Sequence, residues 1–293
     1  MKKIFKPHEG KLVEVTEPLP TSILFYFKPN EKEVEEISRE YKISKDEIVS
    51  LQDPYELPSF EKEKGYSFCV FIVPVKTNRE VETRPLGILL KDRQVVLISY
   101  FKEIGKDYLP SNIDFFLPNF LERVAKEYSK LIEELGRKMY EIQESIRTTT
   151  TNERLFDLFL INKALTYILT SIKSNLGIIR KIEESAPELL NGKITDIIEE
   201  FEQAISLAEV RLNVLSGMIG TSASIISNNI SQIMRVLTAV TIVLTIPTLV
   251  STIYGMNVLL PLQLNPSAFY ILLGISFLLS GLVYLFFRLK GIL

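Results

Sequence analysis

Five threonines recur at helical spacing within an apolar stretch near the C-terminal end of the sequence. Projected at about 100° per residue, they fall within an arc of about 80° and extend over about 21 Å of helix, and Ser227 and Ser231 continue the line. A symmetric ring of helices around a water-filled path needs such a polar ridge. Alternatively, the hydroxyls bond to carbonyls of their own helix or to a neighbouring helix. The hydroxyl ridge consists of Thr238, Thr241, Thr245, Thr248 and Thr252.

The ridge lies in a stretch without any charged side chain. Of the 293 residues 24% are charged, yet the 52 residues from 236 to 287 carry no charge, and only Arg288 and Lys290 follow them. Because about 18 or more uncharged apolar residues are typical of a transmembrane helix, we expect a membrane protein. The first 235 residues hold 32 Lys and Arg against 36 Asp and Glu, so no basic surplus indicates nucleic acid as a partner.

This stretch divides into two predicted spans, residues 236–254 and 267–287, joined by a loop at 255–266. About 20 residues in each helix suffice to cross a hydrocarbon core of about 30 Å. Arg235 precedes the first span and the basic tail, 288–293, follows the second. The positive-inside rule therefore predicts that both ends are cytosolic in a cell membrane and that the loop faces outside.

Pro247 interrupts the first predicted span. A proline inside a helix removes one backbone hydrogen bond, so we expect a kink that frees the carbonyl of Val243. Within a membrane a threonine or a water molecule must then satisfy this carbonyl.

Several classes of site are excluded by counts. With Cys69 as the only cysteine and His8 as the only histidine, the sequence cannot form a disulfide framework, a Cys/His zinc site, a haem pocket or a Cys/His catalytic pair. It has no phosphate loop or dinucleotide turn either, so we do not expect an enzyme. Cys69 is expected in the core of a buried strand. The apolar run in the lysine-rich N-terminal segment is too short for the apolar region of a signal peptide. We therefore expect the N-terminal part to stay in the cytosol.

Residues 1–115 are predicted to form a small α/β domain. Asn30 and Ser44 are candidate N-caps for two charged helices, the first at 30–41. The segments rich in Val, Ile, Phe and Tyr, which predict strands, are 12–16, 22–27, 66–75, 85–90 and 94–100.

Residues 116–235 have a helical period and predict long stalk helices. Pro118 is tolerated in a first turn, a break is expected near 148–151 with Asn152 as the cap of the restart, and one helix is expected from about Ile194 into the first span. Its apolar residues repeat every three and four positions, which indicates packing against copies of itself or against the preceding helices. This apolar seam consists of Ile194, Ile198, Phe201, Ile205, Ala208, Leu212, Leu215 and Ile219, then Ala223, Ile226, Ile230, Ile233, Leu237, Val240 and Leu244.

The first span is followed at once by Tyr254-Gly255-Met256-Asn257. In this position, with two C-terminal spans, a basic tail, a long preceding helix and an α/β amino-terminal domain, Gly-Met-Asn resembles the signature of the CorA magnesium channel family. The resemblance covers essentially the whole chain. It implies a homopentamer, funnel-shaped in the cytosol, in which five copies of the first span line one pore and Tyr254 to Asn257 form the selectivity filter.

A filter of neutral oxygens suits Mg²⁺, which sheds water reluctantly and usually keeps several waters. A ring of Asn257 carbonyl oxygens offers such a surface, and Gly255 allows a tight turn that directs them to the axis. A ring of carboxylates would hold a divalent ion more firmly and slow its exit.

The resemblance also implies roles inside the pore. It makes Leu237 an apolar constriction and Thr248 a hydroxyl ring below the entrance. This sequence departs from the family at Thr245, where members often have methionine, and at Ser231, where they often have asparagine. The outer loop also lacks the acidic residues that many members carry.

The resemblance further implies metal sensing between subunits in the cytosol. Leu51-Gln52-Asp53 is similar to the Leu-Glu-Asp segment of the family, and Asp196 falls on the stalk helix where a partner acid is expected. We therefore expect Asp53 and Asp196 to bind regulatory Mg²⁺ as a cross-subunit pair, because carboxylates brought together repel unless a cation lies between them. Alternatively, Asp196 only stabilises a helix N-terminus. The supporting acids are Glu199, Glu200 and Glu202.

Three hypotheses follow. The first is a Mg²⁺ channel driven by the membrane potential, which also conducts Co²⁺ or Ni²⁺. The second keeps the fold but carries Zn²⁺, Co²⁺ or Ni²⁺, although the expected pore offers no His, Cys or carboxylate for such a metal. The third is a membrane-anchored coiled-coil scaffold without conduction, in which the hydroxyl ridge faces lipid or another helix.

Overall fold

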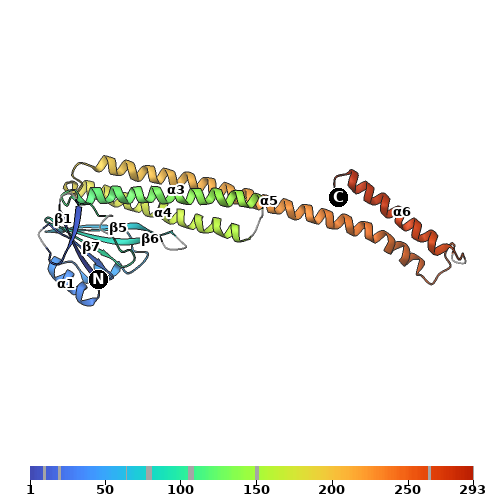
Figure 1. Ribbon diagram of the computed structural model, residues 1–293, viewed down its shortest axis with the longest axis horizontal. Coiled ribbons are helices and arrows are strands. Elements are labelled where there is room, and N and C mark those ends of the chain that lie inside the picture. The colour runs from blue at the N-terminus through green and yellow to red at the C-terminus, as the bar shows by residue number, and fades with distance from the viewer. Residues whose placement is uncertain are drawn as a thin grey trace. The chain divides into compact units, whose positions relative to one another are not determined.

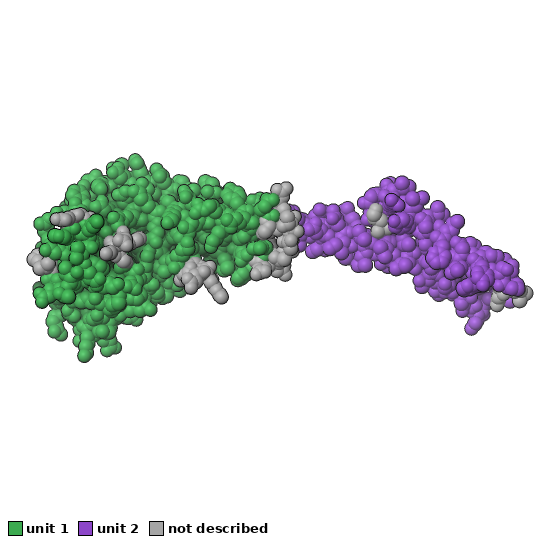
Figure 2. Space-filling view, viewed as in Figure 1, with its two compact units in different colours: residues 1–219 green, residues 220–293 purple. Residues whose placement is uncertain are grey.

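The computed structural model describes residues 1–8, 11–18, 21–63, 65–76, 81–104, 109–148, 152–262 and 265–292. The chain divides into two compact units, residues 1–219 and residues 220–293 (Figure 2). The first unit holds a β-sheet with helices packed on it, and the second holds two apolar helical segments (Figure 1). The predicted fold class, an α/β amino-terminal part followed by long helices and two apolar C-terminal helices, is thereby confirmed.

A seven-stranded sheet forms the centre of the first unit in the described part of the chain. Its strand order is β2-β1-β3-β7-β6-β5-β4, and all neighbours pair antiparallel except β3 and β7, which run parallel. The five predicted strands are confirmed as β2, β3, β5, β6 and β7, with β6 starting earlier than expected. The strands are Lys2–His8 (β1), Lys11–Val15 (β2), Ile23–Phe27 (β3), Ser59–Glu63 (β4), Tyr66–Lys76 (β5), Val81–Lys91 (β6) and Gln94–Ser99 (β7).

Two short helices cover one face of this sheet. α1 (Glu31–Tyr41) and α2 (Lys45–Ser50) both begin with a capping box, in which the side chains of Asn30 and Ser44 accept backbone N–H groups as predicted. Their apolar side chains form one core with alternate residues of the central strands, including Tyr26. Cys69 points into the opposite core and is fully buried, as expected, and burial raises the pKa of its thiol.

Long helices form the opposite core. α3 (Phe116–Thr148), α4 (Asn152–Ser185) and the first part of α5 (Ile194–Tyr254) pack together with the sheet (Figure 1). The break predicted near 148–151 falls between the described parts of these two helices, which end at Thr148 and begin at Asn152. Residues 149–151 lie outside the described residues. A short 3-10 helix, η2 (Pro187–Leu190), precedes α5.

The predicted apolar seam of α5 is confirmed in part in the first unit: Phe201, Ala208 and Leu215 are buried, but other seam positions are displaced by one residue. Ile194, Ile198, Ile205 and Leu212 are only partly buried, and Ile219 is exposed. The structural reason is that α5 packs here into the core made by α3, α4 and the sheet, so several partners, rather than one symmetric copy, determine which side chains are covered. The buried positions are Ile197, Phe201, Ala204, Ala208, Leu215 and Met218.

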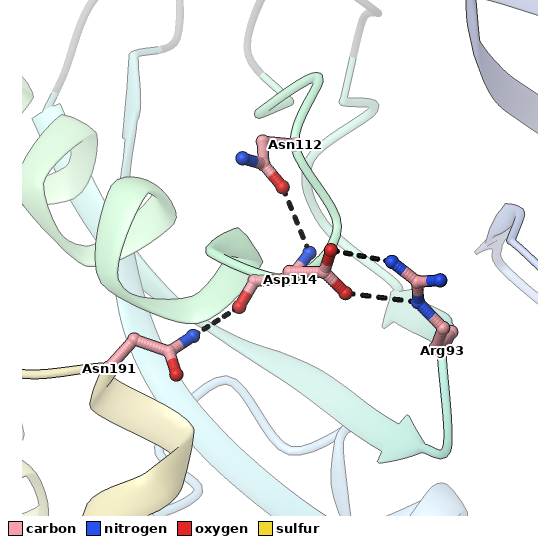
Figure 3. Close-up of polar contacts among 4 residues, drawn as sticks. All are labelled: Arg93, Asn112, Asp114 and Asn191. Atoms are coloured by element: carbon pink, nitrogen blue, oxygen red, sulfur yellow. Dashed lines mark hydrogen bonds and ion pairs between the residues drawn. The ribbon is translucent and has the colours of Figure 1, made fainter.

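Asp114 connects the segments that lead into α3 and α5. Its carboxylate accepts two hydrogen bonds from the Arg93 guanidinium, at 3.0 and 2.6 Å, and its backbone N–H donates to Asn112 Oδ1 (Figure 3). The side-chain amide of Asn191 donates to the Asp114 carbonyl. The β6–β7 turn, the start of α3 and the turn before α5 are thus joined at one residue.

The second unit contains the last part of α5 and α6 (Ala268–Leu289). α5 ends at Tyr254 and α6 begins after Ser267, so both helix boundaries agree with the predicted spans. In the most apolar 18-residue stretch of each helix, only 6% and 11% of the residues are buried. These are therefore not core helices of a globular domain, and a membrane is the environment that suits their exposed apolar side chains.

Candidate functional site

One face of α5 is covered by α6 in the second unit. On α5, Ala239 is 2% exposed, and Val243, Ile246, Val250 and Tyr254 follow it as partly buried residues at spacings of three and four. This spacing defines a single helical stripe. The matching residues of α6, which are buried or partly buried, are Ala268, Leu272, Ser276, Ser280, Val283 and Phe287.

The carbonyl freed by Pro247 has a partner on α6. Pro247 lies inside α5, and the Val243 carbonyl accepts a hydrogen bond from Ser280 Oγ at 3.2 Å. The expectation that a threonine or water satisfies this carbonyl was therefore wrong. Serines spaced four residues apart in an apolar helix are a signal that could have identified the residue, because small polar side chains favour helix–helix contacts in membranes.

The hydroxyl ridge lies away from α6. All five threonines are exposed within the chain, and their mean direction is about 160° from the stripe that α6 covers, by projection at about 100° per residue. Four donate to the carbonyl four residues earlier: Thr241 to Leu237 at 2.8 Å, Thr245 to Thr241 at 2.8 Å, Thr248 to Leu244 at 3.2 Å and Thr252 to Thr248 at 2.7 Å.

Ser231 makes the same kind of bond to Ser227, at 2.9 Å. Bonding within the helix, one of the two structural alternatives for these hydroxyls, is therefore confirmed. The other, bonding to a neighbouring helix, does not hold for α6, which packs on the opposite side. A hydroxyl that donates backwards keeps its oxygen lone pairs available as acceptors. The ridge is thus an exposed row of acceptor oxygens, from Thr238 at one end to Thr252 at the other.

Most of the second half of the predicted seam is exposed, with Ile226 partly buried. Leu237 is 57% exposed and Leu244 64%, and Val240, Ile230 and Ile233 are exposed as well. By the same projection these residues lie about 80° from the hydroxyl ridge and about 120° from the face covered by α6. α5 therefore presents three separate faces in this unit: an α6 contact, an apolar seam and the hydroxyl ridge.

The Gly-Met-Asn turn closes the end of α5. The Gly255 N–H donates to Ser251 O at 2.9 Å, Met256 N–H donates to Ile253 O at 3.3 Å, and Met256 and Asn257 are exposed. Gly255 does not use the left-handed region. A Cβ there would lie 3.3 Å from Ser251 O. A glycine is therefore favoured because the backbone passes close to the Ser251 carbonyl, and not because the turn needs a positive φ. The Tyr254 hydroxyl donates to Pro261 O at 3.4 Å and ties the helix end to the loop.

The two candidate sensor acids occupy separate parts of the first unit. Asp53 lies in the turn after α2, where its Oδ1 accepts from Tyr55 N–H at 2.9 Å. Asp196 is in the first turn of α5. Both are exposed, as a site shared between subunits requires. The structure does not bring them together within one chain, and among the described residues no group of three or more His, Cys, Asp or Glu could hold a metal ion.

The supporting acids are not equivalent. Glu202 is paired with Arg180 of α4 at 2.9 Å, so its charge is already balanced within the chain. Glu199 is exposed, and Glu200 is partly buried. Asp196 has the position of a first-turn acid that stabilises a helix N-terminus, so this alternative remains open beside the sensor.

An acidic site that the sequence did not reveal lies between α2 and β4. Burial and the nearby carboxylates of Glu61 and Glu63 raise the pKa of Glu47 to about 7, although Ser44 N–H bonds to the Glu47 carboxylate. The residues come together only because β4 lies beside the start of α2, and β4 was not predicted.

Comparisons with known proteins agree with this arrangement. The family described as "CorA-like Mg2+ transporter protein" matches residues 22–289. The chain belongs to the CorA family. This places it among divalent-cation transporters of membranes, which are not enzymes. The "Cobalt/magnesium transport protein CorA" of Methanocaldococcus jannaschii is 23% identical over an alignment of 283 residues, and the match covers 90% of this chain and 89% of that protein.

Solved structures show the same fold. The complete structure of the CorA magnesium transporter from M. jannaschii has a TM-score of 0.79 at 20% identity, and the match covers 98% of this chain and 97% of that one. The cytoplasmic domain of ZntB from Vibrio parahaemolyticus has a TM-score of 0.58 at 11% identity, covering 78% of this chain and 97% of that domain. The CorA fold thus extends over both units of the chain.

Proposed function

We propose that this chain is a Mg²⁺ channel that also admits Co²⁺ or Ni²⁺, and that α5 lines its path. The observation that carries the proposal is the direction of the hydroxyl ridge, which lies opposite the face covered by α6. If α6 faces lipid, the ridge faces the axis of a ring of α5 helices. A membrane-anchored scaffold without conduction does not require a row of five exposed acceptor oxygens.

The chemistry of the ridge suits a hydrated cation. The waters around Mg²⁺ point their hydrogens outward, and they need acceptors that do not replace them. The threonine oxygens supply these acceptors, and Asn257 would supply amide oxygens at the entrance. The membrane potential would drive entry, because a divalent charge gains about 4.6 kcal/mol per 100 mV.

Assembly supplies the rest of the site. A single α5 cannot enclose a path, and its exposed seam with Leu237 and Leu244 offers the apolar surface through which copies would pack. We propose the homopentamer known for the family, with both termini cytosolic and the loop after Tyr254 outside. Leu237 would then form the apolar constriction, where the seam adjoins the ridge.

Regulation by cytosolic Mg²⁺ is part of the proposal. Asp53 and Asp196 are exposed on different elements, and in this proposal they meet across a subunit boundary. Bound Mg²⁺ would hold adjacent subunits together and keep the path closed, and loss of the ion would let the carboxylates repel one another.

Ion flux into liposomes tests the function directly. Purified protein is reconstituted, and uptake of Mg²⁺, Co²⁺, Ni²⁺ and Zn²⁺ is compared for the wild type, Asn257→Ala and Asn265→Ala. Asn265 is a matched control, because its side-chain oxygen already accepts from Ser267 N–H at 2.9 Å.

We expect Mg²⁺ uptake that is lost in Asn257→Ala and kept in Asn265→Ala. Uptake of Zn²⁺ in preference to Mg²⁺ would favour the second hypothesis, and no uptake of any ion would favour the scaffold. If Mg²⁺ uptake by Asn257→Ala equals that by Asn265→Ala, Asn257 is not part of the selectivity filter.

A further inference from the structure

The most unusual contact in the second unit is the hydrogen bond between Ser280 and Val243. Pro247 has no N–H, so the Val243 carbonyl loses the donor that every regular helix provides. In hydrocarbon an unsatisfied carbonyl is costly, and a kinked helix needs an external donor there. Ser280 of α6, which is only 8% exposed, provides that donor: its Oγ lies 3.2 Å from the Val243 carbonyl oxygen.

The nearby threonines do not compete for this role. Thr241, Thr245 and Thr248 donate to Leu237, Thr241 and Leu244, so each hydroxyl hydrogen is already used on another carbonyl. In the described part of the chain, Ser280 is therefore the side chain that completes the interrupted backbone.

Ser276 provides an internal comparison. It lies one turn before Ser280 on the same buried face of α6, but its hydroxyl donates to Leu272 O of its own helix at 2.8 Å. Two serines at one helix contact thus make different bonds, and only that of Ser280 joins the two helices.

The hydrogen bond between Ser280 and Val243 lies at the point where Pro247 divides the proposed ion path along α5. Pro247 divides the hydroxyl ridge, with Thr238, Thr241 and Thr245 before it and Thr248 and Thr252 after it. The Gly-Met-Asn turn also follows the proline. Any change in the bend at Pro247 therefore moves the outer threonines and Asn257 relative to the inner ridge.

We infer that Ser280 is a positioning residue, which holds the bend of α5 at Pro247 and so aligns the outer part of the ridge with the inner part. The inference rests on the proposed function, because alignment matters only if α5 lines the path. Ser280 itself faces α5 and not the ion.

A mutant cycle tests the inference. The variants are Ser280→Ala, Ser276→Ala as the matched control, Pro247→Ala, and the double variant Pro247→Ala/Ser280→Ala. Pro247→Ala restores an N–H that can bond to the Val243 carbonyl, which makes the serine hydroxyl dispensable. Mg²⁺ flux per assembled oligomer and thermal stability in detergent are measured for each.

We expect Ser280→Ala to lower the flux about three- to tenfold, the range that corresponds to one lost hydrogen bond. Ser276→Ala should change it little. In the Pro247→Ala background, Ser280→Ala should have no further effect on flux or on thermal stability.

Each other outcome contradicts the inference. Equal flux in Ser280→Ala and Ser276→Ala, or a loss that persists without the proline, would show that the bond does not act through the bend. Lower stability with unchanged flux per oligomer would show a purely structural role. If Ser280→Ala does not assemble, Ser280→Thr, which keeps the hydroxyl, must assemble and conduct. Absence of flux in the wild type would instead contradict the proposed function.

Discussion

The side-chain amide of Asn175 forms two hydrogen bonds with the backbone of Ile72. Ile72 N–H donates to Asn175 Oδ1 at 2.9 Å, and Asn175 Nδ2 donates to Ile72 O at 2.7 Å. Strand β4 pairs with β5 only as far as Val70, so this amide of α4 continues the hydrogen bonding where the strand has ended. Tyr128 of α3 also donates to Ile72 O, at 2.8 Å. Both helices are thereby fixed to one residue of the sheet.

Replacement of this amide should destabilise the first unit. Asn175→Leu leaves the Ile72 N–H buried without a partner and removes one donor from its carbonyl, which should cost about 2–4 kcal/mol. Urea unfolding of the full chain in detergent, followed by circular dichroism, measures the loss. The exposed Asn213 on α5 is the control, and Asn213→Leu should change the midpoint little. Similar midpoints for the two variants would contradict the prediction.

The hydroxyl ridge should respond to loss of its oxygens and not to loss of side-chain volume. Thr245→Val keeps the shape but removes the acceptor, so Mg²⁺ flux should fall about three- to tenfold. Thr245→Ser keeps the hydroxyl and should conduct nearly as well as the wild type. Flux in liposomes is the measurement, and a serine variant as impaired as the valine variant would show that packing, not the oxygen, matters.

The proposed sensor predicts a change in protease resistance. Asp53→Lys or Asp196→Lys should weaken the protection that Mg²⁺ gives to the cytosolic part, because a lysine repels the cation that would join two subunits. Limited proteolysis with and without Mg²⁺ reports this. Glu14→Lys on β2, also an exposed acid, is the control for the change in charge. If Mg²⁺ protects both aspartate variants as well as it protects the wild type, Asp53 and Asp196 do not form the regulatory site.

Glu47 should make the stability of the first unit depend on pH. Its pKa is raised to about 7 in the folded chain, above the value of an ordinary glutamate, so the folded state binds the proton more tightly than the unfolded state. The resulting stabilisation is complete below about pH 4 and is lost as the pH rises through 7. Glu47→Gln should therefore raise the melting temperature relative to wild type at pH 8 more than at pH 5. Thermal melts at both pH values, with Glu14→Gln at an exposed position of β2 as control, check this.

The amino-acid sequence predicts helix caps and helix ends well, because these depend on residues that are close together in the chain. The N-caps Asn30 and Ser44 and the helix end at Tyr254 depend on a few neighbouring residues, and the structure confirms them. β1 and β4 were missed because lysines and glutamates give them a polar composition, and their pairing with distant strands stabilises them.

Long-range partners could not be predicted in the same way. The projection of α5 placed the threonines on one face, but it could not show which face α6 covers. Nor could it show that Ser280, 37 residues from Val243, supplies the missing donor. Part of the seam was displaced in the first unit for the same reason, since the packing of α3 and α4 determines which apolar residues of α5 are buried.

The backward hydrogen bonds of the threonines have a consequence for anions. Because Thr241, Thr245, Thr248 and Thr252 each use their hydrogen on a carbonyl of α5, these side chains have no proton left to offer. Chloride and phosphate are held in proteins by N–H and O–H donors, and these four side chains give them none. At these four positions, a ring of such helices would therefore favour cations over anions without a charged side chain.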